Sequence, residues 1–145
     1  MSDSSPVSIL HIHATCVEKS GRGVLLLGES GSGKSDLALR LLSAGWSLVA
    51  DDQVLLQIKE NELYASAPIP LQGMIEVYGL GVFQVSFTLS AKIFLALQLQ
   101  PLGSAIERFP EIEYNEWLGV KKPQISLCAF HASAVQKLDI YMSKI

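Results

Sequence analysis

Short apolar runs and alternating apolar and polar positions predict a chain dominated by strands. One strand is expected over residues 7–17, where β-branched residues are frequent, and a fully buried one over Val24–Leu27, after a turn at 19–23. Residues 91–100 also favour a strand, although their apolar run is compatible with a short helix. Further strands are expected at 46–50, in a hairpin of 54–59 and 62–65, and at 123–130, and residues 73–81 predict a strand that enters a tight loop.

Two segments have the spacing of amphipathic helices. The leucines of Ser35–Ser43 recur at helical intervals, and Gly45 provides a stop signal. A second helix is expected over Ala132–Ile145, whereas 101–119, which contains two prolines, reads as a loop with at most one helical turn. These elements predict one α/β domain over residues 1–145, strand-rich and without the even strand–helix alternation of a doubly wound fold.

Composition excludes several classes of protein. Hydrophobic residues make up 49% and charged residues 17% of the chain, which excludes a disordered protein. The net charge is −3 without a Lys/Arg cluster, so no nucleic-acid partner is expected. No apolar run approaches the roughly 20 residues of a membrane span, and no secretory signal is visible, so we expect a cytoplasmic protein without a membrane partner. The mean hydropathy of +0.32 suggests surface buried in a homo-oligomer, and Cys16 and Cys128 read as buried free thiols.

The strongest chemical signal is a glycine-rich loop between the buried strand and the first helix. Its sequence fits the pattern G-x-x-x-x-G-K-[ST], which predicts that backbone N–H groups point inward at the phosphates of ATP. The lysine would reach the β/γ oxygens and the final serine would ligate Mg²⁺. The loop consists of Gly28, Glu29, Ser30, Gly31, Ser32, Gly33, Lys34 and Ser35.

Two consecutive carboxylates, Asp51 and Asp52, follow the strand after this helix. Either can hold Mg²⁺, directly or through water, or accept a proton from a substrate hydroxyl. Neighbouring side chains on an extended chain point in different directions, so two distinct roles are expected. We assign Asp51 to the metal site.

In this order, the motifs resemble the catalytic domain of bifunctional HPr kinase/phosphorylase, over about residues 9–130. The resemblance implies an ATP-dependent kinase that phosphorylates a serine of the phosphocarrier protein HPr, with a fold similar to that of phosphoenolpyruvate carboxykinase. The motifs that carry it are His13-Ala14, Gly28–Ser35, Leu48–Asp52 and Ile75–Gly81.

The resemblance also implies roles for individual residues. His13 matches the family's catalytic histidine, and Lys34 and Ser35 match its phosphate-binding lysine and magnesium-binding serine. Asp52 matches the acid that takes the seryl proton, and Glu76 matches the second magnesium ligand. A carboxylate within reach of a serine hydroxyl has a physical purpose, because serine is a poor nucleophile unless its proton is removed.

Other positions fit the family less closely. Arg108 aligns loosely with a catalytic arginine, while His11 and His131 match no motif and are expected to be structural. The family's signature has an arginine where this chain has Tyr78, and the late arginine- and glycine-containing loop is replaced by Phe-His-Ala-Ser-Ala at 130–134. These departures predict that phosphorolysis, the reverse activity, is weak or absent.

We therefore expect a short form of the family, without its N-terminal domain, that acts as a kinase on HPr or a related phosphotransferase-system protein and regulates carbon metabolism. Two alternatives remain open. One is a small-molecule kinase with the same site, and the other is a non-catalytic ATP-binding regulatory module.

Overall fold

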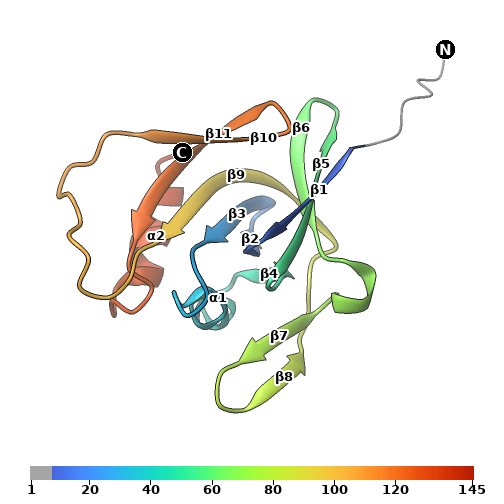
Figure 1. The fold of residues 1–145 in the computed structure, drawn as a ribbon, viewed down its shortest axis with the longest axis horizontal. Coiled ribbons are helices and arrows are strands. Elements are labelled where there is room, and N and C mark those ends of the chain that lie inside the picture. Colours follow the sequence, from blue (N-terminus) through green and yellow to red (C-terminus); the bar gives the residue numbers. More distant parts are fainter. Residues whose placement is uncertain (1–7) are drawn as a thin grey trace.

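The fold is built around a curled mixed sheet (Figure 1). The computed structural model describes residues 8–145. Its path runs β1-β5-β6-β9-β3-β2-β4, and β11 pairs with the later part of β9 and carries β10. The elements are β1 (Ile9–His13), β2 (Thr15–Lys19), β3 (Arg22–Leu27), α1 (Lys34–Ser43), β4 (Ser47–Ala50), β5 (Gln53–Lys59), β6 (Glu62–Ser66), the 3₁₀ turn η1 (Ile69–Leu71), β7 (Met74–Val77), β8 (Gly81–Gln84), β9 (Ser90–Leu99), β10 (Glu113–Trp117), β11 (Val120–Leu127) and α2 (Ala134–Met142).

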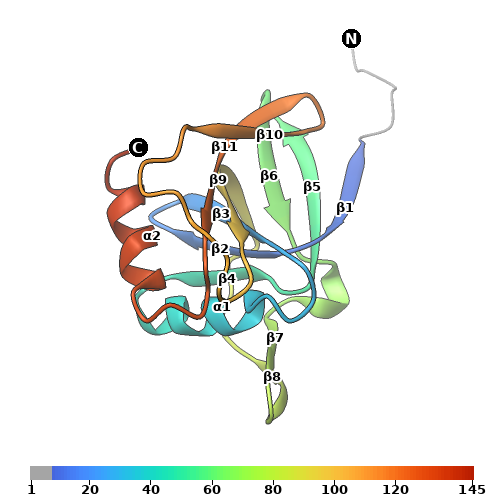
Figure 2. The same cartoon turned by 60° about the vertical axis from the view of Figure 1, so that its left-hand side comes forward.

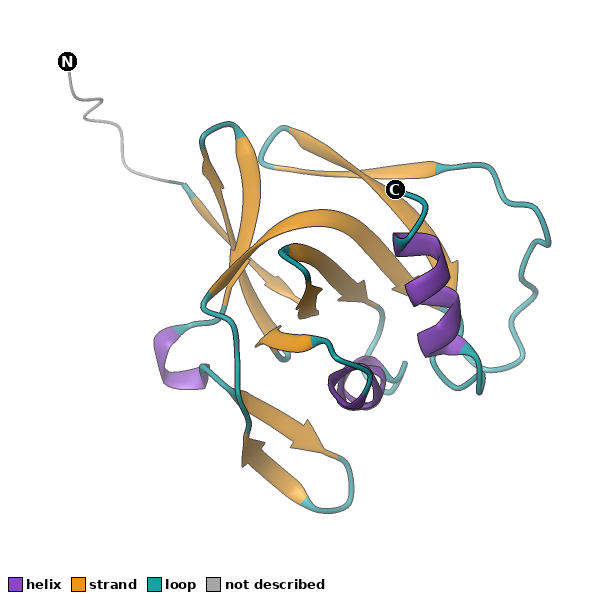
Figure 3. Cartoon of the chain, turned by 180° about the vertical axis from the view of Figure 1, so that it is seen from behind, coloured by secondary structure: helices purple, strands orange, loops and turns teal. Residues whose placement is uncertain are grey.

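Strand β3 is buried on both faces, as its continuous apolar sequence predicts. Val24 and Leu26 face a core that also contains the apolar stripes of both helices, while Leu25 faces a second core between the curled strands. Both helices lie on the same side of the sheet (Figure 3). Leu37 and Leu41 of α1 are fully buried there, and such burial stabilises the fold by about 1.5–3 kcal/mol per side chain.

Several strand ends meet at one edge of the sheet. β3 runs parallel to β9, and β4 has the same direction as β3 because both are antiparallel to β2. The glycine loop therefore leaves β3 at the edge where β4 ends in the two aspartates. β1 ends and β2 begins at this same edge, because Ala14 N–H donates to the Asp52 carbonyl. Local sequence signals from distant parts of the chain are thus brought together.

The hairpin of β7 and β8 is separate from the main sheet and projects from the body of the molecule in two views (Figures 1 and 2). Its inner end is anchored by Ile75, which is fully buried, and by a hydrogen bond from Val85 N–H to the Gly73 carbonyl. Its tip exposes Tyr78 and Leu80 to solvent.

The structure corrects two of the predicted elements. The strand expected over 7–17 is two strands separated at Ala14, because β1 pairs only with β5 whereas β2 inserts between β3 and β4. The loop expected over 101–119 contains β10, which joins β11 through a two-residue turn with positive φ at Leu118 and Gly119.

The remaining expectations agree with the structure in element type. Residues 91–100 form a strand rather than a helix, and β11 ends earlier than expected, at Leu127, before a turn. α2 is shorter than the segment predicted for it, because the chain first turns at 130–133. Within residues 8–145, both helices fall short of the length and apolarity that crossing a bilayer requires.

Candidate functional site

The glycine loop has a backbone that side chains would obstruct. Gly28, Gly31 and Gly33 all have positive φ values, of 152°, 83° and 94°. A Cβ on Gly28 would lie 2.4 Å from the Ser32 hydroxyl, and one on Gly33 would lie 2.8 Å from the Ala129 methyl group. The loop therefore forms a close-fitting cradle at the N-terminus of α1, where backbone N–H groups favour anions.

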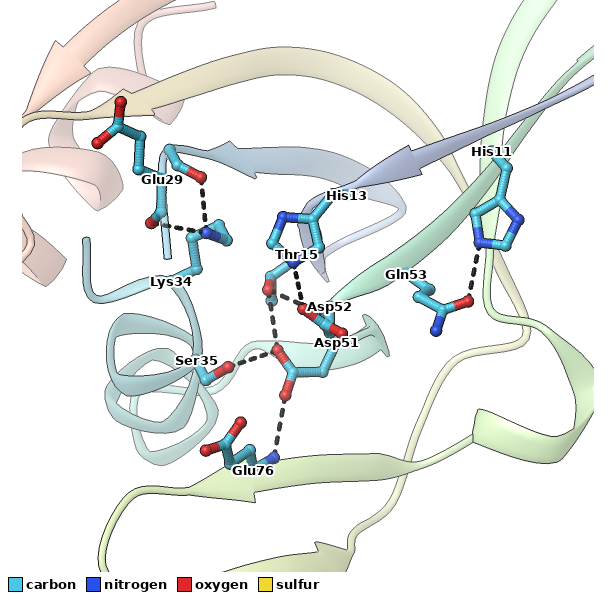
Figure 4. A network of polar contacts seen from close by, with 11 residues as sticks. His11, His13, Thr15, Glu29, Lys34, Ser35, Asp51, Asp52, Gln53 and Glu76 are labelled. Atoms are coloured by element: carbon cyan, nitrogen blue, oxygen red, sulfur yellow. Dashed lines mark hydrogen bonds and ion pairs between the residues drawn. The ribbon is translucent and has the colours of Figure 1, made fainter. Parts of the chain in front are cut away.

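Two polar groups in this cradle suit a phosphate ligand. The Ser32 hydroxyl is buried and has no hydrogen-bond partner among the described residues. Lys34 Nζ donates to the carbonyls of Gly28 (2.7 Å) and Glu29 (3.0 Å), so the ammonium lies inside the loop (Figure 4). Burial lowers the pKa of Lys34 from its usual 10.5, and the nearby carboxylates of the tandem pair oppose this shift.

Asp51 is the buried member of the tandem pair, at 7% exposure. Its Oδ1 accepts hydrogen bonds from Ser35 Oγ at 2.7 Å and from Thr15 Oγ1 at 2.9 Å. Its Oδ2 accepts the backbone N–H of Glu76 at 3.0 Å. One carboxylate therefore connects the phosphate loop, β2 and the β7–β8 hairpin, and each of its oxygens is already hydrogen-bonded (Figure 4).

Asp52 lies in the opposite environment, with a side chain 63% exposed. Its Oδ1 is 2.5 Å from His13 Nε2, and its backbone has a left-handed φ of 68°. This turn of the backbone separates the two carboxylates, which contact different partners. The two side chains point in different directions, as expected for neighbours on the chain, and their distinct roles stay a prediction.

The remaining candidate residues differ in whether they contact the loop and the aspartates. Glu76 is exposed on β7 and joins the network only through its backbone N–H. The chain between β9 and β10 forms an outer loop (Figure 1). Arg108 belongs to this loop by its position in the sequence, and its guanidinium carbon is 5.9 Å from the ring centre of Phe109. In residues 8–145 no hydrogen bond or ion pair joins it to the loop or the aspartates. His11 bonds Gln53 at 2.9 Å, away from the phosphate loop, and the backbone of His131 closes a turn before α2.

Sequence reasoning missed Thr15. Its side chain is fully buried, and its hydroxyl contacts both Asp51 and the backbone of Asp52. The available signal was a hydroxyl-bearing residue between the apolar Ala14 and Cys16, because a buried hydroxyl requires a partner. Burial also raises the pKa of the Cys16 thiol, which fits the expectation of an unreactive core cysteine.

The residues fit a nucleotide bound through a divalent metal ion better than a metal ion alone. No cluster of three or more His, Cys, Asp or Glu side chains within 8–145 could hold a metal by itself. A hydroxyl, carboxylates and phosphate oxygens together supply the oxygen ligands that Mg²⁺ prefers. The glycine cradle, the buried Ser32 hydroxyl and the enclosed Lys34 ammonium supply the phosphate side.

Fold and site together define a phosphate-loop protein whose loop is set on a curled mixed sheet. Comparison with known proteins identifies the family. The sequence model described as "HPr Serine kinase C-terminal domain" matches residues 7–136, and the chain therefore belongs to that family.

Relatives agree with this assignment, and a solved structure has the same fold. The chain is 40% identical over 127 residues to the HPr kinase/phosphorylase of Caldanaerobacter subterraneus, and 39% identical over 124 residues to that of Caldicellulosiruptor bescii. These matches cover 80% and 78% of this chain but only 42% and 40% of the relatives, so the chain spans about two fifths of their length. The HPr(Ser) kinase/phosphatase from Coxiella burnetii superposes with a TM-score of 0.82 at 24% identity, covering 93% of this chain and 95% of that one. This likeness confirms the predicted fold class.

Proposed function

We propose that this protein is an ATP-dependent protein-serine kinase that phosphorylates HPr or a related phosphotransferase-system protein and thereby regulates carbon metabolism. The observation that carries the proposal is the division of the tandem aspartates. Asp51 is bonded to the phosphate-loop serine, Ser35, and Asp52 is open to solvent beside it. Transfer to a protein hydroxyl requires a buried acid on the nucleotide side and an exposed acid on the acceptor side.

On the nucleotide side, the backbone of residues 28–35 would bind the phosphates of ATP and Lys34 would contact the β/γ oxygens. Ser35 and Glu76 would hold Mg²⁺, with Asp51 fixing the Ser35 hydroxyl. When bound, the metal neutralises phosphate charge and so favours transfer.

On the acceptor side, Asp52 would take the proton of the serine hydroxyl. The seryl oxygen then bonds to the γ-phosphorus as the bond from that phosphorus to ADP breaks. His13, which is 2.5 Å from Asp52, would orient this carboxylate. We assign Arg108 the weakest role, because among the described residues its cationic group is recorded only beside the ring of Phe109 and has no ion pair with Asp51 or Asp52.

We further propose that phosphorolysis is weak or absent. This reverse reaction needs donors that hold inorganic phosphate in line with the phosphoserine, and arginine is the residue best suited to that task. Tyr78, where the family has an arginine, is 94% exposed at the hairpin tip. Residues 130–134 supply no arginine either.

The cellular setting follows from the proposed partners. HPr and ATP meet in the cytoplasm, which is where we place the enzyme. Self-association is also proposed, because Leu80, Val82 and Phe83 expose apolar surface on the β7–β8 hairpin. Light scattering on the purified chain measures the oligomeric state directly.

The test is to incubate the protein with labelled ATP, Mg²⁺ and purified HPr, and to map the phosphorylated residue by mass spectrometry. Phosphoserine on HPr, absent with Lys34→Ala, is the expected result. Transfer to a small molecule instead would favour a small-molecule kinase. Tight ATP binding without transfer to any acceptor would favour a regulatory module. Supplying phosphoserine-HPr with millimolar phosphate tests the reverse reaction, and pyrophosphate release as fast as forward transfer would contradict its proposed weakness.

A further inference from the structure

One buried hydroxyl is hydrogen-bonded to both members of the aspartate pair. Thr15 is the first residue of β2, and its side chain is fully buried. Its Oγ1 is 2.9 Å from Asp51 Oδ1 and 3.5 Å from the backbone nitrogen of Asp52. A backbone N–H can only donate, so the Thr15 oxygen accepts there and its own proton is free to point at the Asp51 carboxylate.

The backbone of Asp52 is held in a conformation that an aspartate seldom adopts. Its φ is 68°, in the left-handed region. Two backbone hydrogen bonds surround it, from Gln53 N–H to the Asp51 carbonyl at 2.8 Å and from Ala14 N–H to the Asp52 carbonyl at 3.2 Å. Thr15 contributes the contact to the remaining backbone donor of Asp52, so three interactions keep this residue turned.

We propose that Thr15 is a positioning residue that keeps the two carboxylates divided. It fixes Asp51 toward Ser35 and holds the turn that presents Asp52 to His13 and to solvent. The proposal rests on the proposed function, in which Asp51 supports the nucleotide side and Asp52 accepts the seryl proton. Among the described residues, the Thr15 hydroxyl has hydrogen bonds to the aspartate pair and none to the phosphate loop.

The chemistry of this position requires a hydroxyl. Valine has nearly the same shape as threonine, but its second methyl group would face the buried Asp51 carboxylate and leave the Asp52 N–H without its partner. Serine keeps the hydroxyl and loses only a methyl group. The pair Thr15→Val and Thr15→Ser therefore separates hydrogen bonding from packing.

The activity test compares these variants with Thr88→Val. Thr88 donates to the Glu18 carboxylate at 2.9 Å, away from the site, and provides a matched loss of a threonine–carboxylate bond. We expect Thr15→Val to lower kcat about 10- to 100-fold while KM for HPr changes less than about threefold. Thr15→Ser and Thr88→Val should each keep kcat within about threefold of the unaltered protein.

A second readout does not depend on the acceptor. The imidazole resonances of His13 report its contact with Asp52, and their chemical shifts are compared by NMR at one fixed pH on the ligand-free protein. Thr15→Val should move these resonances, whereas Thr15→Ser should leave them in place. Thr15→Ala, which removes the hydroxyl without inserting a misplaced methyl group, serves if the valine variant does not fold.

The outcomes separate the two hypotheses. If the unaltered protein does not phosphorylate HPr, the proposed function fails, and the NMR comparison still decides the role of Thr15. Unchanged kcat and unchanged His13 resonances in Thr15→Val would overturn the positioning role. Equal loss in Thr15→Ser and Thr15→Val would also overturn it, because packing rather than the hydroxyl would then matter.

Discussion

The two sides of the site differ in how much of their structure is already in place. On the nucleotide side, Asp51 is buried and both of its oxygens are hydrogen-bonded to protein groups. On the acceptor side, Asp52 and His13 contact each other, and their side chains are 63% and 53% exposed. One peptide bond separates these environments.

The nucleotide side is preorganised by the protein itself, whereas the acceptor side would be completed by a bound partner. Groups fixed in advance around the phosphates need no rearrangement at the moment of transfer, which is the main source of electrostatic catalysis. An exposed carboxylate is a weaker base for a hydroxyl than a desolvated one, since water competes for it. A docking protein would exclude that water and place its serine at Asp52. Under the proposed function, the exposed side of the site would be completed by the protein that carries the serine.

The largest expected effect comes from the nucleotide side. Lys34→Ala removes the ammonium enclosed by the loop, and we expect kcat/KM for phosphoryl transfer to fall about 10³-fold. Lys137→Ala, at an exposed position on α2, is the matched control. Steady-state kinetics with labelled ATP measure both. Near-normal turnover by Lys34→Ala on HPr would remove the loop from the proposed site.

A smaller loss is expected on the acceptor side. Asp52→Asn keeps the size of the side chain but cannot accept the seryl proton, so transfer should fall about 10²-fold. Binding of Mg–ADP, measured by calorimetry, should be unchanged because Asp52 points to solvent. Asp36→Asn, on the exposed face of α1, is the control. A parallel loss of nucleotide binding would contradict the division between the two carboxylates.

Glu76→Gln tests whether Glu76 has a magnesium-binding role that is separate from the role of Asp52. The backbone N–H that bonds Asp51 remains, and only the exposed carboxylate loses its charge. We expect the Mg²⁺ concentration for half-maximal rate to rise about tenfold, with the rate at saturating Mg²⁺ reduced much less. A magnesium titration of the initial rate measures this, with Glu60→Gln at an exposed turn as the control. If Glu76→Gln instead behaves like Asp52→Asn, the two residues do not have separate roles.

The sequence predicted the parts of the structure that local signals determine. The glycine loop, α1 and β3 follow from a contiguous motif with its flanking strand and helix, and the tandem aspartates lie at the end of β4 as expected. The break at Ala14 could not be predicted, because both segments are strands and the break arises from the different partners with which they pair. β10 was missed because its turn has leucine at the first positive-φ position, where glycine, asparagine or aspartate is usual.

Contacts between segments far apart in the chain also could not be predicted from the sequence. Thr15 is 36 residues from Asp51, so nothing in the local pattern connects them. Arg108 shows the converse case, in which a resemblance suggests a role that no contact within residues 8–145 accompanies, so that role stays a prediction.

The smallest effect is therefore expected for Arg108. Its guanidinium stacks on the neighbouring Phe109, itself exposed, and in residues 8–145 it makes no ion pair with the carboxylates of the site. Exposed charges are screened by salt and contribute little to a fixed geometry. We expect Arg108→Ala to lower kcat/KM for HPr less than about threefold, through a higher KM and not a lower kcat. The difference from the unaltered protein should become smaller at high salt. Arg108→Lys, which keeps the charge, should recover most of the lost kcat/KM. A loss in kcat as large as that of Lys34→Ala would mean that the 101–112 loop closes over the site during transfer, and would return Arg108 to the catalytic residues.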